Sequence, residues 1–283
     1  METNKNAANF SVQDIQDLDV ELKVGILGTV NPDGMPHLTM ISSLRPYAES
    51  GLVWGQFTEG LSKQNVRQNS KTGFLIMSLD RRVWRGKARF THTAKSGAEY
   101  ENFNNTPMFR YNAYFGIHTV YYMDLVELSG REALPMGQVI SAAVKTVLAR
   151  NLTRKHHSDI LNPWVRGLFN KLDNLKFLGY VGTDGFPVIL PIIQTQVLDG
   201  ERVLFSLGAY EDALRRIPAD IPMAVFGLSF SMEDVLLRGN YTGIQRVGGI
   251  QCGVVEIDWV YNSMPPVPQQ VYPPVAVNKI VEF

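Results

Sequence analysis

A strand, a tight turn and a second strand are predicted for residues 25–44, and the same pattern returns at residues 179–193. Both copies contain Gly-Thr, then Asp-Gly-x-Pro, then an apolar run, although the first copy has three extra residues in its turn. Asp-Gly between apolar runs predicts a β-hairpin, because glycine readily adopts the positive φ that a tight turn requires. We therefore expect a mainly β protein organised around two hairpins.

The spacing downstream of the two hairpins is also repeated. Arg85-Gly86 begins 52 residues after Asp33, and Arg238-Gly239 begins 54 residues after Asp184. An ordered series of this kind favours an internal duplication over two unrelated hairpins in one large β protein. A length of 283 residues is typical of about two domains. We predict a first β domain at 1–135, a helical connector at 136–176 and a second β domain with a proline-rich tail at 177–283.

Charge and cysteine content restrict the class of protein. Lys plus Arg and Asp plus Glu both number 27, so no net field favours nucleic acid or an anionic membrane. The single cysteine, Cys252, cannot form an internal disulfide, which fits a reducing compartment. The first residues lack an apolar signal core, and no run of about 18 apolar residues occurs. We expect a cytoplasmic protein that binds neither nucleic acid nor membrane.

The first copy contains one segment suited to an anion. A helix is predicted at 11–23, with strands at 51–57, 72–79, 81–93 and 120–128. Residues 59–69 read as a loop that leads into a two-turn helix. A helix start offers free backbone N–H groups and a positive dipole end, to which Ser62 and Lys63 add a hydroxyl and an ammonium. The segment suits a phosphate, although a capping serine and a solvated lysine would give the same pattern.

The strand at 81–93 is unusually basic. Counted in twos, one face carries Arg85, Lys87 and Arg89, so this face must meet solvent, an anionic ligand or a partner subunit. The opposite face carries Trp84, Gly86, Ala88 and Phe90. The segment that follows, 99–117, is rich in aromatic residues and amides. It could cover a flat ring, or equally form a buried crossover.

The connector and the second copy lack these signals. Helices are predicted at 136–150 and 164–177, the second with Asn162 as its cap and Pro163 at its first position. The basic run around His156-His157 is interpreted as a solvated linker, and no metal site is expected. Where the first copy has its phosphate segment, the second has Glu211 and Asp212, whose carboxylates would repel a phosphate. We therefore expect the second copy to be degenerate.

Taken in order, these motifs resemble the FMN-binding split-barrel superfamily, which includes pyridoxamine 5'-phosphate oxidase and many flavin reductases. The resemblance rests on GILGTVNPDGMPHLTMIS, LVWGQF and EGLSKQNVRQNSKTGFLIM, and covers residues 12–129, with a weaker copy at 177–262. It implies two tandem six-stranded split β-barrels with peripheral helices, the second a degenerate copy. The chain end shows no counterpart of the arginine-rich substrate motif of true pyridoxamine phosphate oxidases, so that particular activity is not expected.

The resemblance also implies which residues bind FMN. The second hairpin strand would run along the flavin, the end of the third strand and the helix start would hold the ribityl chain and phosphate, and the basic strand would contribute from a neighbouring subunit. In this sequence these positions are Thr39, Met40, Ile41 and Ser42, then Gln56, Phe57, Thr58, Ser62 and Lys63, then Trp84, Arg85 and Lys87. No catalytic residue is assigned, and His37 and His118 are interpreted as structural hydrogen-bonding groups.

The function expected from this resemblance is that of a flavoprotein oxidoreductase, in which FMN transfers electrons between a small-molecule donor and acceptor. One alternative is a non-catalytic protein that binds FMN or another planar anion in the same cleft. Another is a split barrel that uses haem or a deazaflavin. Because the family usually dimerises, we expect either a homodimer or an intramolecular pseudo-dimer in which the second copy replaces the partner subunit.

Overall fold

A computed structural model describes residues 9–57, 59–107, 116–263 and 268–275. Its contacts divide the chain into two compact units. The first unit contains residues 1–135 together with Leu178–Leu190, and the second contains Met136–Phe177 together with residues 191–283. The sequence-based boundaries differ from this division, because they keep the connector separate and place the whole second hairpin in the second barrel.

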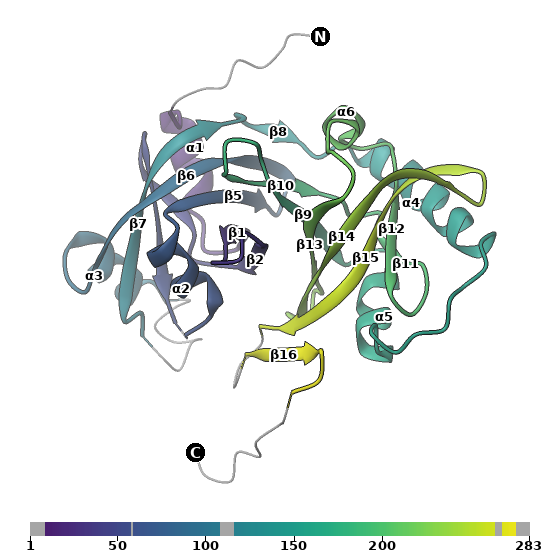
Figure 1. Ribbon diagram of the computed structural model, residues 1–283. Helices are drawn as coiled ribbons and strands as arrows, with labels where there is room; N and C mark the ends of the chain where they lie inside the picture. Colours follow the sequence, from purple (N-terminus) through teal and green to yellow (C-terminus); the bar gives the residue numbers. More distant parts are fainter. Residues whose placement is uncertain (1–8, 58, 108–115, 264–267, 276–283) are drawn as a thin grey trace. The chain divides into compact units, whose positions relative to one another are not determined.

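The first sheet is antiparallel and follows the order β2-β1-β5-β6-β7-β4-β3, with β8 paired to β6 (Figure 1). Its first hairpin is the one expected from the sequence, and Gly34 in the turn has a φ of 78°. The strands are β1 (Lys23–Val30), β2 (Pro36–Met40), β3 (Arg45–Ala48), β4 (Gly51–Gln56), β5 (Lys71–Ser78), β6 (Arg82–Ala94), β7 (Thr119–Leu128) and β8 (Glu132–Ala133).

Three helices lie at the periphery of this sheet, α1 (Val12–Leu18), α2 (Leu61–Gln68) and α3 (Ala98–Asn105). Ser11 caps α1 and forms a capping box with Asp14. Helix α1 ends before residue 23, however, because β1 begins there. A hydrophobic core of the unit gathers apolar side chains from several strands of the sheet, including Trp54, Trp84 and Tyr121.

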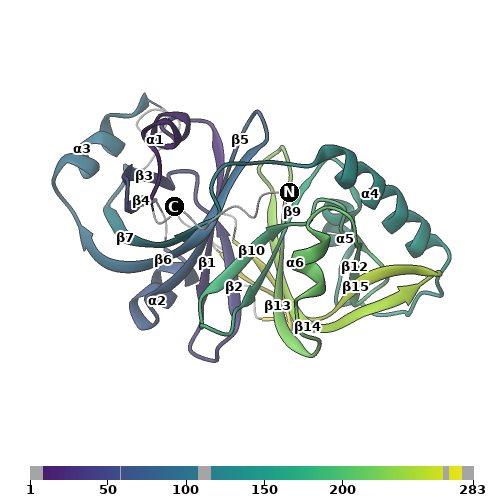
Figure 2. The same ribbon diagram turned by 90° about the horizontal axis from the view of Figure 1, so that it is seen from above.

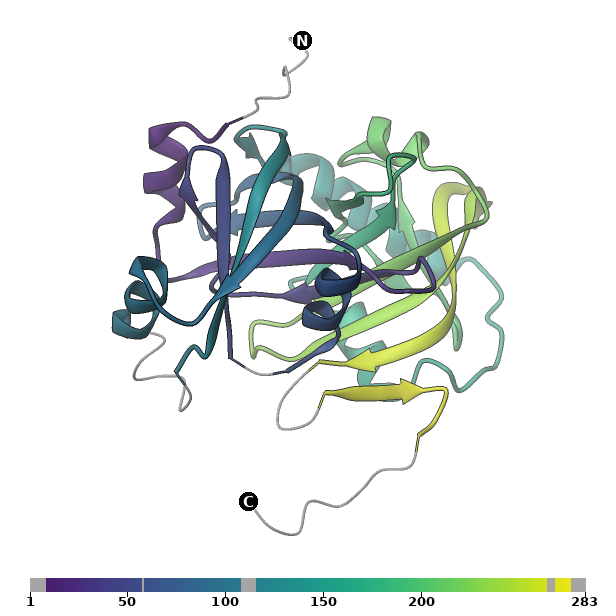
Figure 3. The same ribbon diagram turned by 60° about the vertical axis from the view of Figure 1, so that its left-hand side comes forward.

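The second sheet follows the order β10-β9-β13-β14-β15-β12-β11, with β16 paired to β15; Figure 3 shows β15 and β16 as yellow strands lying side by side. Its turn residue Gly185 has a φ of 80°, close to that of its counterpart in the first hairpin. The strands are β9 (Leu175–Val181), β10 (Pro187–Pro191), β11 (Gln196–Val197), β12 (Arg202–Ser206), β13 (Ile221–Leu228), β14 (Asp234–Val247), β15 (Ile250–Asn262) and β16 (Gln269–Tyr272).

The helices of the second unit are α4 (Met136–Asn151), α5 (Pro163–Asn170) and α6 (Glu211–Arg215), and α4 packs on β12 and β15 (Figure 2). The side chain of Asn162 accepts a hydrogen bond from the backbone N–H of Val165 at 3.0 Å, which confirms the expected cap. The sequence-based helix at 164–177 is too long. Helix α5 ends at Asn170, and residues from Leu175 onward form β9 because they pair within the sheet.

The two sheets have the same strand order when each strand is replaced by its counterpart, so β1 corresponds to β9 and β6 to β14. This agreement supports the duplication inferred from the hairpins. The mainly β class is confirmed, but the expectation of six-stranded barrels needs correction. Each sheet adds a short edge strand, β3 or β11, and an eighth strand, and among the described residues the pairing path stays open at both ends. None of the helices in the described ranges has the length and apolar character needed to cross a membrane.

Candidate functional site

The end of β2 and the start of α2 bring two hydroxyl groups together. The Oγ1 of Thr39 and the Oγ of Ser62 lie 2.6 Å apart, although the residues are 23 positions apart in the chain. Helix α2 packs against β1 and β2, and Asn65 on the same helix donates to Thr29 of β1 at 3.0 Å. The N-cap of α2 is Gly60, which supplies no side-chain cap. The start of this helix is thus open to an anion and flanked by hydroxyls.

Lys63 is buried beside this helix start, with only 6% of its surface exposed. Its ammonium lies 3.7 Å from the position that a Cβ on Gly60 would take, so the side chain folds back towards the first turn of its own helix. Burial lowers the pKa of the Lys63 ammonium, and the nearby carboxylate of Glu59 partly opposes this effect. A buried ammonium of this kind gains most from an anion, because it has little contact with water.

Gln56, at the end of β4, is fixed at both ends of its amide. Its Oε1 accepts from the hydroxyl of Tyr121 at 3.0 Å, and its Nε2 donates to Glu59 at 2.5 Å. Tyr121 in turn accepts from Arg67 of α2 at 3.1 Å. These bonds connect β4, β7 and α2 around the segment before the helix. The sequence analysis identified Gln56 but not Tyr121. The only signal for Tyr121 was its alternation along the strand predicted at 120–128, which places its aromatic ring on the inner face.

The other residues expected along the flavin occupy a continuous stretch at and after the end of β2. Met40 and Ser42 are half-buried and Ile41 is buried. The backbone N–H of Ile41 donates to the carbonyl of Gly25 at 2.7 Å, which holds this stretch against β1. Phe57 is half-buried after β4. Thr58, also expected at the site, lies outside the described residues.

The basic strand does not join this cluster through its charges. Arg85 pairs with Glu132 of β8 at 3.1 Å, and Lys87 contacts Glu127 at 2.7 Å. Lys87 also lies 2.9 Å from Asp184, a residue of the 178–190 segment that belongs to the same compact unit. These carboxylates neutralise the basic face that the sequence left open to an anion or a partner. They were missed because they come from segments distant from the basic strand in the sequence.

Trp84 is a core residue rather than a residue at a cleft. Its side chain is completely buried, and its indole N–H donates to Asp14 of α1 at 2.8 Å. The indole therefore has no exposed surface in the described structure, and its role in binding FMN stays a prediction. The sequence placed Trp84 on the face of the strand opposite the basic residues, which agrees with this burial.

The two histidines near the site and the aromatic segment at 99–117 were also considered from the sequence. His118 shares a 2.8 Å hydrogen bond with the hydroxyl of Thr119, and His37 is buried on β2. The segment at 99–117 was expected to cover a ring or form a crossover, and its residues 108–115 lie outside the described residues. In the described part of this segment, Phe103 is buried and its ring lies against Arg45. Among the residues described, no group of three or more His, Cys, Asp or Glu side chains could hold a metal ion.

No protein-family model matches the chain, and no curated protein matches it. Similar solved structures include an FMN-binding protein from Syntrophomonas wolfei, 16% identical, covering 41% of this chain and 83% of its own, with a TM-score of 0.35. A putative pyridoxamine 5'-phosphate oxidase from Lactobacillus delbrueckii is 15% identical, covering 43% and 94%, with a TM-score of 0.34. An F420 reductase is 19% identical, covering 39% and 90%, with a TM-score of 0.31.

Each of these matches extends over about two fifths of this chain and most of the other. The chain is thus a mainly β protein with two sheets of equal strand order.

Proposed function

We propose that the first unit binds FMN and that the phosphate of FMN lies against Ser62 and Lys63 at the start of α2. The observation that carries this proposal is the convergence of the Thr39 and Ser62 hydroxyls, 2.6 Å apart, with a buried ammonium at a helix start that has no side-chain cap. Hydroxyls, an ammonium and a positive helix end are the groups that recognise a phosphate dianion.

The charge at Lys63 also suits a phosphate group. Lys63 sits in a desolvated position, and the carboxylate of Glu59 is the negative charge that raises its pKa back towards the usual value. A bound phosphate would supply a stronger counter-charge at the same ammonium. The half-buried residues Met40 and Ser42, with the buried Ile41 between them, would then run along the flavin ring, with Gln56 held by Tyr121 beside the ribityl chain.

Bound FMN supplies the electron transfer, and the protein supplies binding, orientation and electrostatics. We therefore infer a flavin-dependent oxidoreductase that passes electrons between a small-molecule donor and acceptor. The names of two similar structures, an FMN-binding protein and an F420 reductase, support a flavin-type cofactor.

The proposal is tested by titrating FMN and riboflavin, which lacks the phosphate, into the wild-type protein and a Lys63→Ala variant. Loss of a charge-assisted contact costs about 1.5–3 kcal/mol, so the affinity for FMN is expected to fall by roughly 10- to 100-fold. The affinity for riboflavin should stay unchanged, because the lysine has no phosphate to contact there. Quenching of flavin fluorescence measures both affinities.

Lys145→Ala provides the matched control, since Lys145 is an exposed lysine on α4. It should bind both ligands as the wild type does. If Lys63→Ala weakens the binding of FMN and of riboflavin equally, the lysine acts on folding or on the ring, and the phosphate assignment is wrong.

The spectrum of the purified protein tests the identity of the cofactor. A haem Soret band, or a colourless protein that does not bind added FMN, would contradict FMN as the cofactor. Bleaching of the flavin band near ~450 nm by NADH or NADPH without oxygen would support reductase activity.

The second unit is expected to bind no FMN at the corresponding position. Its short helix α6 begins with Glu211 and Asp212 in place of the hydroxyl and ammonium, and Glu211 pairs with Arg215 at 2.6 Å. Two carboxylates at this place repel a phosphate dianion. We propose that the second copy takes the place of a partner subunit. Binding of one FMN per chain is the expected stoichiometry, and two equal sites would contradict it.

A further inference from the structure

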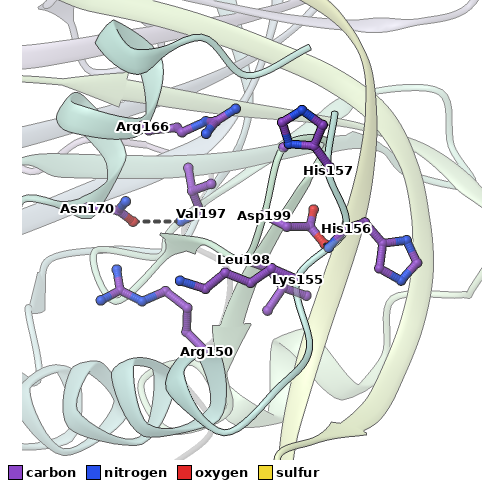
Figure 4. Close-up of a pocket in the computed structure, with 10 residues that line it drawn as sticks. Arg150, Lys155, His156, His157, Arg166, Asn170, Val197, Leu198 and Asp199 are labelled. Carbon is purple, nitrogen blue, oxygen red and sulfur yellow. Dashed lines mark hydrogen bonds between the residues drawn. The ribbon is translucent and has the colours of Figure 1, made fainter. Parts of the chain in front are cut away.

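A cavity of about 430 Å³ lies wholly within the second unit. Its walls come from the end of α4, the loop between α4 and α5, helix α5, and the chain after β11 (Figure 4). The volume is within the range of roughly 300–1,000 Å³ that small-molecule sites occupy. From the sequence, this loop was interpreted only as a solvated basic linker. In the structure, the side chains of the loop line the cavity instead.

Three basic side chains line this cavity, namely Arg150 from α4, Lys155 from the loop and Arg166 from α5. Figure 4 shows the ends of Arg150 and Lys155 extending into the same space, with Arg166 on the opposite wall. Within the described part of the chain, no carboxylate lies within 4.0 Å of any of the three. Like charges held together without counter-ions raise the affinity of the space between them for an anion.

The two arginines are held in place by neutral oxygen atoms. Arg150 donates to the Oε1 of Gln196 at 2.9 Å, and Arg166 donates to the carbonyl of Ser158 at 3.0 Å. A guanidinium has five N–H donors, so each arginine keeps donors for a ligand while these bonds fix its orientation. The cavity is in this respect preorganised for an anion.

The one carboxylate in the lining, Asp199, is already satisfied. Burial alone would raise the pKa of Asp199, but hydrogen bonds from the side chain of Arg202 and from the backbone N–H groups of Glu201 and His156 lower it. The ion pair with Arg202 lies at 2.5 Å. Asp199 therefore fixes the loop at His156 rather than neutralising the three cations of the cavity.

Beside the cavity, the backbone of the loop at Ser158 packs closely against Gly200, which lines the cavity. A Cβ on Gly200 would lie 2.0 Å from the carbonyl oxygen of Ser158, so only glycine lets the loop approach the segment after β11 this closely. This approach places Lys155 and His157 at the cavity. The site therefore depends on contacts between segments more than 40 residues apart in the sequence.

We propose that this cavity is a binding site for an organic phosphate monoester, with the phosphate held by Arg150, Lys155 and Arg166. A phosphate dianion matches three cations better than a single carboxylate does, and guanidinium groups bind its oxygens in bidentate fashion. The volume leaves room for a group of about the size of a sugar beside the phosphate. The site shares no residue with the proposed FMN site in the first unit, so either proposal can fail without the other.

Calorimetric titration with ribose 5-phosphate tests the proposal, with ribose and inorganic phosphate as the comparison probes. We expect ribose 5-phosphate to bind, ribose not to bind, and inorganic phosphate to bind more weakly. Lys155→Gln and Arg150→Gln should each weaken ribose 5-phosphate about tenfold or more, because each removes a charge-assisted contact. Lys63→Ala, in the first unit, should leave this binding unchanged.

Arg154→Gln is the matched control, since Arg154 is the exposed basic residue next to Lys155 but does not line the cavity. Its affinity should remain within about twofold of the wild type, because it lacks a phosphate contact. Circular dichroism confirms that all variants are folded. An equal loss in Arg154→Gln and Lys155→Gln would overturn the site in favour of unspecific charge attraction. Absence of binding to the wild type, or inorganic phosphate binding as tightly as ribose 5-phosphate, would also overturn it.

Discussion

Replacing Gly86 with alanine is expected to destabilise the first unit by about 3 kcal/mol or more. A Cβ at this position on β6 would lie 1.9 Å from the carbonyl oxygen of Glu127 and 2.9 Å from its carbon. Both are backbone atoms of β7, so they can move only if the β6–β7 pairing itself is disturbed. Inserting extra volume into a packed interior costs 1–3 kcal/mol, and the rigidity of the neighbouring strand places this position at or above the upper end.

The same substitution in the second unit should have the same effect. Gly239 is the counterpart of Gly86 in the repeated Arg-Gly pair, and a Cβ there would lie 1.8 Å from the carbonyl oxygen of Glu256. Both glycines are next to a shift in strand register, at 87/88 in the first sheet and 238/239 in the second. A bulge of this kind brings the two backbones close together, which explains why both copies carry glycine here.

Urea denaturation followed by circular dichroism measures both losses. Gly137→Ala is the control, because a Cβ at Gly137 meets no atom within 4 Å on α4. It should leave stability unchanged or raise it by about 0.5–1 kcal/mol, since alanine is the better helix former. Gly86→Ala or Gly239→Ala with wild-type stability would contradict the close approach of the two strands.

Replacing Lys176 with methionine is expected to stabilise the second unit at neutral and acidic pH by several kcal/mol. Lys176 is completely buried at the start of β9, and its ammonium donates to the carbonyl of Lys171. Burial lowers the pKa of Lys176 from 10.5 to about 7, with a small opposing effect from Asp173. Methionine has a similar length and no charge to bury, so it removes the desolvation cost while it fills the same space.

The pH dependence of this gain has a definite sign. Between pH 7 and pH 10.5 the unfolded chain holds a proton on Lys176 that the folded chain has lost, so the stability of the wild type rises with pH over that window. The slope for one proton is about 1.4 kcal/mol per pH unit. The advantage of Lys176→Met should therefore be largest near pH 6, at roughly 3–5 kcal/mol, and shrink steadily towards pH 10.5.

Urea denaturation at pH 6, 8 and 10 gives the difference between variant and wild type, which cancels the titration of other groups. Lys145→Met is the matched control, because Lys145 is exposed on α4 and should show no such pH dependence. A Lys176→Met variant that is less stable than the wild type at pH 6 would show that the buried ammonium is held by interactions stronger than its desolvation cost.

Local signals in the sequence determined much of the fold. The Asp-Gly turns predicted both hairpins because the positive φ of Gly34 and Gly185 is a property of the turn itself. The cap at Asn162 was likewise predicted, since its partner lies three residues away. The repeated Arg-Gly pair indicated a duplication, which the equal strand order of the two sheets supports.

Features that depend on distant partners were decided only by the tertiary structure. The basic face of β6 looked open in the sequence, but Glu132, Glu127 and Asp184 meet it from other segments. In the same way, residues 171–177 continued a helical pattern, although sheet pairing makes β9 begin at Leu175.

Both proposed sites show this division between local and distant information. The sequence identified Thr39, Ser62 and Lys63, whereas the structure showed that the hydroxyls of Thr39 and Ser62 meet and that Lys63 is buried. The cavity around Lys155 had no signal beyond a run of basic residues. Periodicity and turn chemistry are fixed by neighbours along the chain. Which charges meet is fixed by strand order, bulges and loop packing, and these depend on residues far apart in the sequence.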